Sequence, residues 1–173
     1  MGGHNRTRRN REIERKFLVE WLPPNLEQSR SLVIEQGYLA TDESTGRQVR
    51  LRKTGNATSL TFKVGRGSHR EEREIKLSPK QFAVLWPGTA GRRLRKVRHE
   101  IIWDNVTIEI DEYRGRHKDL VVAEVEFPDT ASCRRFQPPW WFGREVTREK
   151  RYSNVRLAME SPDSHSIETS SLN

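Results

Sequence analysis

The side chains of this chain with the most chemical potential are acids and bases that recur at every second position. Glu12, Glu14 and Lys16 form the first such run, in the sequence EIERK. Carboxylates bind hard divalent cations such as Mg²⁺ or Mn²⁺ through oxygen. Lysine and arginine bind phosphoryl oxygens, and the arginine fork suits that geometry especially well. Together these residue types suit a polyanionic ligand that binds with a metal ion.

The same alternation returns in six further segments, and each time the charged side chains share one face of an extended chain, because successive strand residues point to opposite faces. The charged positions are Arg50, Arg52, Lys63, Glu72, Glu74, Lys76, Lys96, Arg98, Glu109, Asp111, Glu124 and Glu126. A solvated outer face is the ordinary explanation for one such strand. Surface strands usually include Ser, Thr and Gln, so seven almost purely charged rows favour a charged interior.

The elements that must position these residues are mostly strands. Alternating or β-branched runs predict strands at 12–19, 31–40, 47–55, 58–67, 70–77, 92–103, 106–113 and 120–127. Gly55-Asn56 is a hairpin signal between two of them. Ser78 as N-cap and Pro79 at the first helical position predict a helix over 78–86. Asp129 is a cap for a second short helix over 129–136.

These elements predict a mainly β (α+β) fold, a closed eight-stranded antiparallel β-barrel with a charged lumen and short flanking helices. Closure would remove the exposed edges, and about eight strands leave room for one small ligand. The two helices would cover the apolar outer face. Residues 1–10 and 159–173 are basic and Ser-rich tails that we expect to be disordered, which leaves one domain at 11–158.

Composition limits the classes of function. The chain has 173 residues, 33% of them hydrophobic and 32% charged, and a net charge of +8, which predicts binding of anions. The single cysteine excludes an intramolecular disulfide and a cysteine-based metal site, and fits a reducing compartment. We expect a cytoplasmic protein without a membrane span or signal peptide. Aromatic residues do not interleave the basic strands, which argues against a nucleic-acid platform. The pattern gives no signal for an oligomeric state.

The ordered set of charged pairs resembles the CYTH superfamily, the triphosphate tunnel metalloenzymes. EIERK matches the E-x-E-x-K hallmark, and the likeness continues through EQGYL, VRLRK, LTFKVG, EEREI, RKVR, EIDEY, AEVEF and PPWWFGREVTREKRY. It spans roughly residues 11–158. IERKFLV and WFGREVTREKRY are most similar to the small bacterial members that hydrolyse inorganic tripolyphosphate, and less similar to class IV adenylate cyclases.

The resemblance implies roles at matching positions. The implied metal ligands are Glu12, Glu14, Glu124 and Glu126, with Glu109 and Asp111 supporting a second metal or orienting the water. The implied triphosphate ligands are Lys16, Arg50, Arg52, Lys63 and Arg98. Lys96 matches a water-activating lysine of related tripolyphosphatases, and a further phosphate contact is an equal alternative. Glu72, Glu74 and Lys76 would support the site by balancing its charges.

The resemblance therefore implies metal-dependent hydrolysis of inorganic tripolyphosphate to pyrophosphate and phosphate, with Mg²⁺ or Mn²⁺ as cofactor. An adenylate cyclase, or a hydrolase of nucleoside or thiamine triphosphates, is an alternative on the same scaffold, although no clear marker of a base-binding pocket is present. A binding module that retains polyphosphate without turnover is a third, which the complete acidic set argues against. The C-terminal RYSNVRLAMES runs into a polar tail, which predicts that the tunnel is open or cup-like at one end.

Overall fold

The computed structural model describes residues 6–9, 13–65 and 71–159, and its main feature is one antiparallel sheet. The order of the ten strands in this sheet is β1-β6-β5-β4-β3-β7-β8-β9-β2-β10. The strands are β1 (Arg6–Arg9), β2 (Ile13–Val19), β3 (Arg30–Asp42), β4 (Arg47–Thr54), β5 (Ala57–Val64), β6 (Glu71–Leu77), β7 (Arg93–Trp103), β8 (Val106–Tyr113), β9 (Val121–Phe127) and β10 (Phe142–Glu145). The predicted strands are therefore confirmed, with β1 and β10 in addition.

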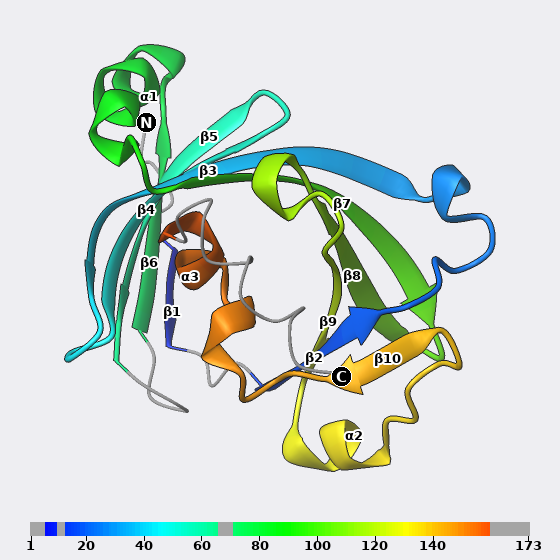
Figure 1. Ribbon diagram of the computed structural model, residues 1–173. Helices are drawn as coiled ribbons and strands as arrows, with labels where there is room; N and C mark the ends of the chain where they lie inside the picture. Colours follow the sequence, from blue (N-terminus) through cyan, green and yellow to red (C-terminus); the bar gives the residue numbers. More distant parts are fainter. Residues whose placement is uncertain (1–5, 10–12, 66–70, 160–173) are drawn as a thin grey trace, which may run out of the picture.

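The sheet curls around a central space (Figure 1). Its strands pair in an open order that runs from β1 to β10. Within the described residues no pairing joins the β1–β6 end of the sheet to the β2–β10 end. The structure therefore corrects the prediction of a closed eight-stranded barrel: the sheet is open and has ten strands. The outermost strands are β1, which pairs with β6, and β10, which pairs with β2.

The N-terminal segment also differs from the prediction. Residues 6–9 were expected to be part of a disordered tail, whereas the structure has them as β1, antiparallel to β6, with Arg6 opposite Glu74. An unpaired edge strand exposes a row of backbone N–H and C=O groups, and β1 satisfies that edge of β6. Of the other predicted tail residues, 1–5, 10 and 160–173 lie outside the described residues, and Met159 is the last residue of a short helix.

Seven short helical segments connect or cover the strands in the described part of the chain. They are α1 (Pro79–Leu85), α2 (Thr130–Arg135), α3 (Asn154–Met159) and the 3₁₀ turns η1 (Leu26–Gln28), η2 (Trp86–Thr89), η3 (Gly115–His117) and η4 (Lys150–Tyr152). Ser78 and Gln81 form the reciprocal hydrogen bonds of a capping box at the start of α1. The Asp129 carboxylate accepts from the backbone N–H of Ser132 at the start of α2. Both predicted helices are therefore confirmed, caps included. None of the described helices is long and apolar enough to span a bilayer.

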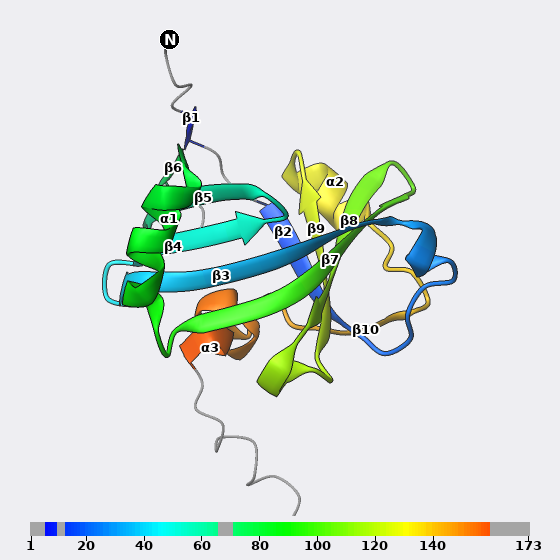
Figure 2. The same ribbon diagram turned by 90° about the horizontal axis from the view of Figure 1, so that it is seen from above.

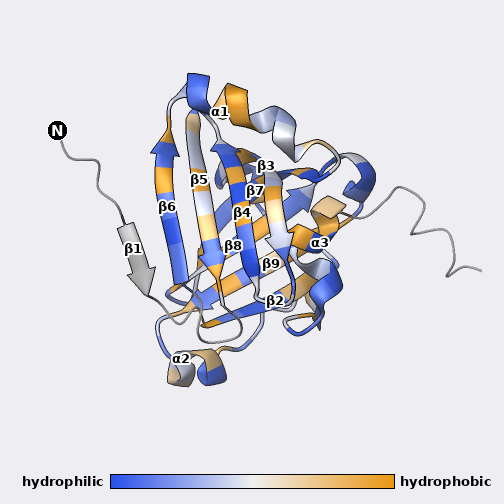
Figure 3. Cartoon of the chain, turned by 90° about the vertical axis from the view of Figure 1, so that its left-hand side faces the viewer, coloured by the Kyte–Doolittle hydropathy of each residue, from blue (hydrophilic) through white to orange (hydrophobic). Residues whose placement is uncertain are grey.

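The main apolar core lies on the outer face of the curl. Phe17, Ile108, Ile110 and Val125 are buried there beneath Trp141 and the segment around α2. Figure 2 shows α1 and α2 at different ends of the sheet, where α1 contacts β5 and β6 and α2 contacts β2 and β9. Alternating hydropathy along β4 and β6 is visible in Figure 3. The apolar half of each alternating strand thus faces outward, and the charged half faces the central space.

The C-terminal segment, which was expected to leave the tunnel open or cup-like at one end, forms α3 inside the curl (Figure 1). Leu157 and Ala158 pack in a second buried cluster with Tyr38 and other residues of the inner face. The carbonyl of Leu157 accepts hydrogen bonds from Arg116 Nη2 at 3.2 Å and from the His117 ring at 2.8 Å. The six residues of α3 are too few to show a helical period, so the sequence pattern does not indicate this helix.

We expect Ile108→Ala to destabilise the protein by roughly 2–5 kcal/mol, because it leaves a cavity in the outer core. Ile108 is 0% exposed, whereas Ile102, in the same β7–β8 hairpin, is 75% exposed. Urea denaturation of Ile108→Ala and of Ile102→Ala as the matched control measures the difference. Equal stability of the two variants would contradict the assignment of the core to the outer face.

Candidate active site

Strand register gathers the predicted acids on the inner face of β2, β8 and β9. Glu14 lies opposite Glu126 and Lys16 lies opposite Glu124 in the β2–β9 ladder. Glu109 lies opposite Glu124 in the β8–β9 ladder. Like charges directly opposite each other on a sheet are destabilising, so this region needs cations, either from the protein or from solution.

Two basic side chains of the protein pair with Glu124. Lys16 Nζ lies 2.7 Å from its Oε1, and Arg98 Nη2 donates to its Oε2 at 3.1 Å. Burial opposes ionisation of Glu124, but the charges of Lys16, Lys96 and Arg98 outweigh burial and hold its pKa well below the ordinary value. Arg98 also pairs with Glu109, whose pKa is nevertheless raised, mainly by burial and then by the neighbouring acids.

Asp111 is the buried centre of a second group of charges. Arg98 donates to it as a fork, Nε to Oδ1 at 2.7 Å and Nη2 to Oδ2 at 2.6 Å, and Lys96 Nζ donates to Oδ2 at 2.5 Å. Burial would lower the pKa of Arg98, but Asp111, Glu124 and Glu109 together raise it. Lys96 is 0% exposed, and burial, with the charge of Arg98, lowers its pKa to about 8 despite Asp111. Its amine also donates to Asn154 Oδ1 at 3.3 Å.

Arg50 and Arg52 on β4 and Lys63 on β5 form a basic group on the inner face, beside the acid Glu72 on β6. Lys63 lies opposite Glu72 in the β5–β6 ladder, with Lys63 Nζ 2.6 Å from Glu72 Oε2. Arg50 Nη2 donates to Thr61 Oγ1 at 3.3 Å and lies 3.8 Å from Glu72 Oε1. Burial lowers the pKa of Arg52 to about 10, and the nearby charges of Arg50 and Arg98 add to this effect.

Two guanidinium nitrogens in this basic group lack partners. Arg50 Nε and Arg52 Nε are both buried without a hydrogen-bond partner among the described residues. Buried polar groups are nearly always hydrogen-bonded in native proteins, because an unmade bond costs the desolvation of the group. In the described conformation each of these two donors thus leaves one hydrogen bond unmade.

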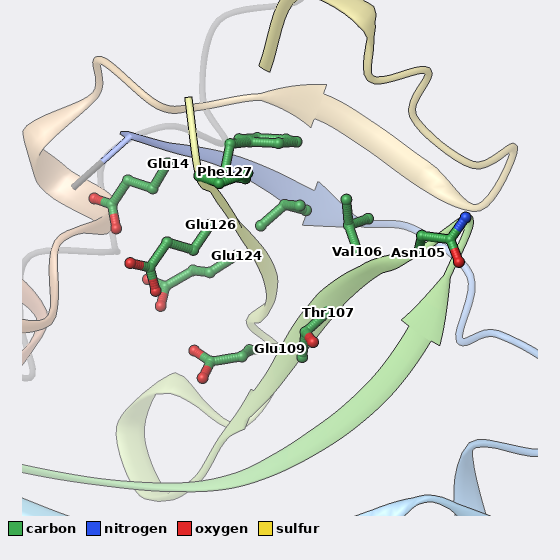
Figure 4. A pocket seen from close by; sticks show the side chains of 10 residues that line it. Glu14, Asn105, Val106, Thr107, Glu109, Glu124, Glu126 and Phe127 are labelled. Atoms are coloured by element: carbon green, nitrogen blue, oxygen red, sulfur yellow. The ribbon is translucent and has the colours of Figure 1, made fainter. Parts of the chain in front are cut away.

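Both groups line one cavity of about 550 Å³. Ten of the predicted site residues line it: Glu14, Lys16, Arg50, Arg52, Lys63, Glu72, Arg98, Glu109, Glu124 and Glu126. A second hollow of about 460 Å³ shares the carboxylates of Glu14, Glu109, Glu124 and Glu126, and has no lysine or arginine in its wall (Figure 4). Figure 4 shows these four side chains directed toward the same space from three strands. The cavity thus has a basic wall and an acidic wall.

The acidic wall has the donor chemistry of a hard-cation site, because every candidate ligand there is a carboxylate oxygen. In the described conformation no three His, Cys, Asp or Glu side chains of residues 6–9, 13–65 and 71–159 converge closely enough to hold a metal ion. Glu109 and Glu124 are turned toward Arg98 instead. Glu12, a predicted ligand, lies outside the described residues.

The structure places four predicted residues away from the cavity wall. Lys96 and Asp111 are each 0% exposed and lie behind the wall, paired with each other. On β6, Glu74 accepts from Thr61 Oγ1 at 3.1 Å, and Lys76 is exposed to solvent. Neither of these β6 residues lines the cavity.

The sequence pattern missed the contribution of the C-terminal segment. The cavity is also lined by Lys150, Ser153, Asn154, Val155 and Arg156. Arg156 Nη2 lies 2.6 Å from Glu43 Oε1, which joins α3 to the turn between β3 and β4. These residues lie on η4 and α3 rather than on strands, so the search for alternating charges could not find them. The cluster of basic residues in KRYSNVR was the available signal.

Comparison with known proteins identifies the family of this chain. A model of the CYTH domain matches residues 10–135. An inorganic triphosphatase of Nitrosomonas europaea is 40% identical over 152 residues, which are 87% of this chain and 99% of that protein. An inorganic triphosphatase of Acetivibrio thermocellus is 31% identical over 149 residues, 85% of this chain and 92% of that protein.

Solved structures show the same likeness. The crystal structure of an inorganic triphosphatase has a TM-score of 0.70 at 38% identity, over 87% of this chain and 96% of that one. A Bacillus halodurans structure, with a TM-score of 0.55 at 16% identity over 72% of this chain and 84% of its own, shares the fold alone. Because the family model and both curated relatives span the strands that carry the charged rows, this chain belongs to the CYTH domain family.

Proposed function

We propose that this protein hydrolyses inorganic triphosphate to pyrophosphate and orthophosphate with the help of a divalent cation. The observation that carries the proposal is a single cavity with guanidinium and ammonium groups on one wall and four carboxylates on the other. Two relatives that align with most of this chain are named inorganic triphosphatases, which supports the same activity.

The basic wall would bind the phosphate chain. Arg50, Arg52 and Lys63 come from the strands, and Lys150 and Arg156 from the C-terminal segment. Planar guanidinium groups match the oxygens of a phosphoryl group, and the unpartnered Nε atoms of Arg50 and Arg52 supply donors that need an acceptor. Lys16 and Arg98 reach the same cavity from the acidic side, where they would contact the phosphoryl group nearest the carboxylates.

The acidic wall would hold the cation. Glu14, Glu124 and Glu126, with Glu109 in support, have the oxygen ligands that Mg²⁺ or Mn²⁺ prefers, and Glu12 is a further proposed ligand. Such a cation supplies neutralisation of the charge on the phosphoryl oxygens. Glu109 and Glu124 would have to turn from Arg98 toward the cation, which would also free Arg98 for the phosphate.

The reaction is an in-line displacement at a terminal phosphorus. The oxygen of a water molecule forms a bond to that phosphorus, and the bond from phosphorus to the bridging oxygen breaks. The bridging oxygen leaves with its electron pair as part of pyrophosphate, and the proton of the attacking water passes to a carboxylate or to solvent. Fixed cations beside the phosphoryl oxygens stabilise the charge of the transition state.

Lys96 and Asp111 are best explained as positioning residues. Both lie behind the cavity wall, and the Asp111 carboxylate holds the guanidinium of Arg98 in a two-bond fork. The amine of Lys96 donates to Asp111 and to Asn154, so Lys96 also connects the inner face to α3. This arrangement favours a supporting role for Lys96 over either direct activation of water or a phosphate contact.

We expect purified protein to release phosphate from tripolyphosphate with Mg²⁺ or Mn²⁺, and to lose this activity with EDTA. Glu14→Gln removes a charged oxygen ligand from the acidic wall, so we expect kcat/KM to fall by about a hundredfold or more. The measurement is phosphate release, with ATP and pyrophosphate as parallel substrates. Glu20→Gln, an exposed residue outside the cavity, is the matched control and should keep wild-type activity.

Other outcomes would point elsewhere. If tripolyphosphate gives no phosphate in any metal while ATP gives cyclic AMP, the protein is a cyclase. If tripolyphosphate binds tightly without turnover, the protein is a binding module. Equal activity of Glu14→Gln and wild type would contradict the proposed role of the acidic wall in catalysis.

We expect Asp111→Asn to lower stability by roughly 3–5 kcal/mol, because it leaves Arg98 and Lys96 buried without their shared counter-charge. Urea denaturation measures this loss, and kcat should fall with it as Arg98 loses its orientation. Asp119→Asn, in the exposed turn after β8, is the control and should change stability by no more than about 0.5 kcal/mol. A fully stable and active Asp111→Asn would refute the positioning role.

A further inference from the structure

The edge strand β1 brings positive charge to the sheet, and the proposed mechanism gives this charge no role. Its sequence is RTRR, and it pairs with the acidic start of β6, EERE. The strand ends before residue 10, where the match to the CYTH domain begins. An arginine lies opposite a glutamate at three positions of the ladder: Arg6 opposite Glu74, Arg8 opposite Glu72 and Arg9 opposite Glu71. Opposite charges that face each other across an antiparallel pair stabilise it, so the charges fit this register.

The register also divides the arginines of β1 between the two faces of the sheet. Residues directly opposite each other in an antiparallel ladder share a face, and neighbours along a strand alternate between faces. Glu72 lines the cavity and lies opposite Lys63, so Arg8 occupies a position on the inner face. Arg6, two residues away, belongs to the same face, whereas Arg9 belongs to the outer face. The strand β1 therefore extends the inner face by one strand beyond β6.

The acid on the inner face of β6 already binds cations of the basic wall. Lys63 Nζ lies 2.6 Å from Glu72 Oε2, and Arg50 Nη2 lies 3.8 Å from Glu72 Oε1. Burial would raise the pKa of Glu72, but the hydrogen bond from Lys63 and the charges of Lys63 and Arg50 lower it overall. The carboxylate thus stays charged and keeps both cations. A phosphate chain that enters the cavity must compete with Glu72 for them.

The charges along the inner face show what β1 changes. Lys63 and Glu72 form a row with one positive and one negative charge, which cancel. Arg8 is the third member of this row and leaves it with one net positive charge. In the neighbouring row Arg6 adds a positive charge opposite Glu74 in the same way. A net positive charge on this part of the inner face favours a polyanionic ligand.

We propose that β1 belongs to the triphosphate site, where Arg8 serves as a counter-charge for Glu72. Glu72 would then release Lys63 and Arg50 to the phosphoryl oxygens, and Arg6 would act in the same way one row further along β6. Arginine suits this role, because it stays charged and its planar fork matches a carboxylate. Arg8 is thus a positioning residue that acts through Glu72. This inference rests on the proposed function.

The first test compares two arginines of the same strand on opposite faces. We expect Arg8→Gln to raise KM for tripolyphosphate about three- to tenfold and to leave kcat within about twofold of wild type, because it weakens phosphate binding and leaves the acidic wall unchanged. Arg9→Gln removes the same charge from the outer face and is the matched control, which should keep both constants within about twofold. Arg8→Lys keeps the charge, so its KM should lie closer to that of wild type than the KM of Arg8→Gln does.

The second test asks whether Arg8 acts through Glu72. In a Glu72→Gln background, Arg8→Gln should change KM by less than about twofold, because the neutral amide needs no counter-charge. Binding without turnover is measured with EDTA present. There tripolyphosphate should raise the melting temperature of wild type and of Arg9→Gln by more than that of Arg8→Gln, and added salt should reduce the difference.

The outcomes distinguish this inference from the function on which it rests. If wild type neither hydrolyses nor binds tripolyphosphate, the proposed function fails. If wild type does both and Arg8→Gln has the same KM as Arg9→Gln, the role of β1 alone is overturned. If Arg8→Gln raises KM as much in the Glu72→Gln background as in wild type, Arg8 does not act as a counter-charge for Glu72.

Discussion

The inner face of this protein depends on one buried interaction, the fork between Arg98 and Asp111 on neighbouring strands. Both charges are removed from water, and burying either charge alone would cost too much free energy. The ion pair is therefore compatible with folding only when its two hydrogen bonds have good geometry. Arg98 also forms ion pairs with Glu124 and Glu109. Lys96 donates a hydrogen bond to Asp111 from the side away from the cavity. One cation thereby orders carboxylates from two strands, which is what makes an acidic wall compatible with a folded sheet.

A sheet with charges on its inner face must obtain its stability elsewhere. In this protein the outer face supplies it: Phe17, Ile108 and Val125 bury their side chains against Trp141 and the segment around α2. Hydrophobic burial scales with area and does not depend on which face of the sheet it uses. The usual arrangement of a curled sheet, apolar inside and polar outside, is therefore reversed over β2, β8 and β9, and the concave side is left to bind ions.

The C-terminal segment forms part of the cavity wall. Asn154 accepts hydrogen bonds from Tyr113 Oη at 2.6 Å and from Lys96, and Arg116 and His117 hold the last carbonyls of α3. These contacts fix Lys150 and Arg156 in the cavity wall, opposite the strands. The cavity is thus formed by a sheet and a docked helix, and its basic wall depends on both.

The amino-acid sequence by itself determined which residues carry charge to one face, because a period of two is a local property of an extended chain. Glu14, Lys16, Arg50 and Glu124 could be assigned to a common site for that reason, and the caps at Ser78 and Asp129 to helix starts. Tertiary structure alone decided whether the sheet closes, that residues 6–9 pair with β6, and that Lys96 lies behind the wall. Closure, edge pairing and depth depend on contacts between segments far apart in the chain, which no local pattern contains.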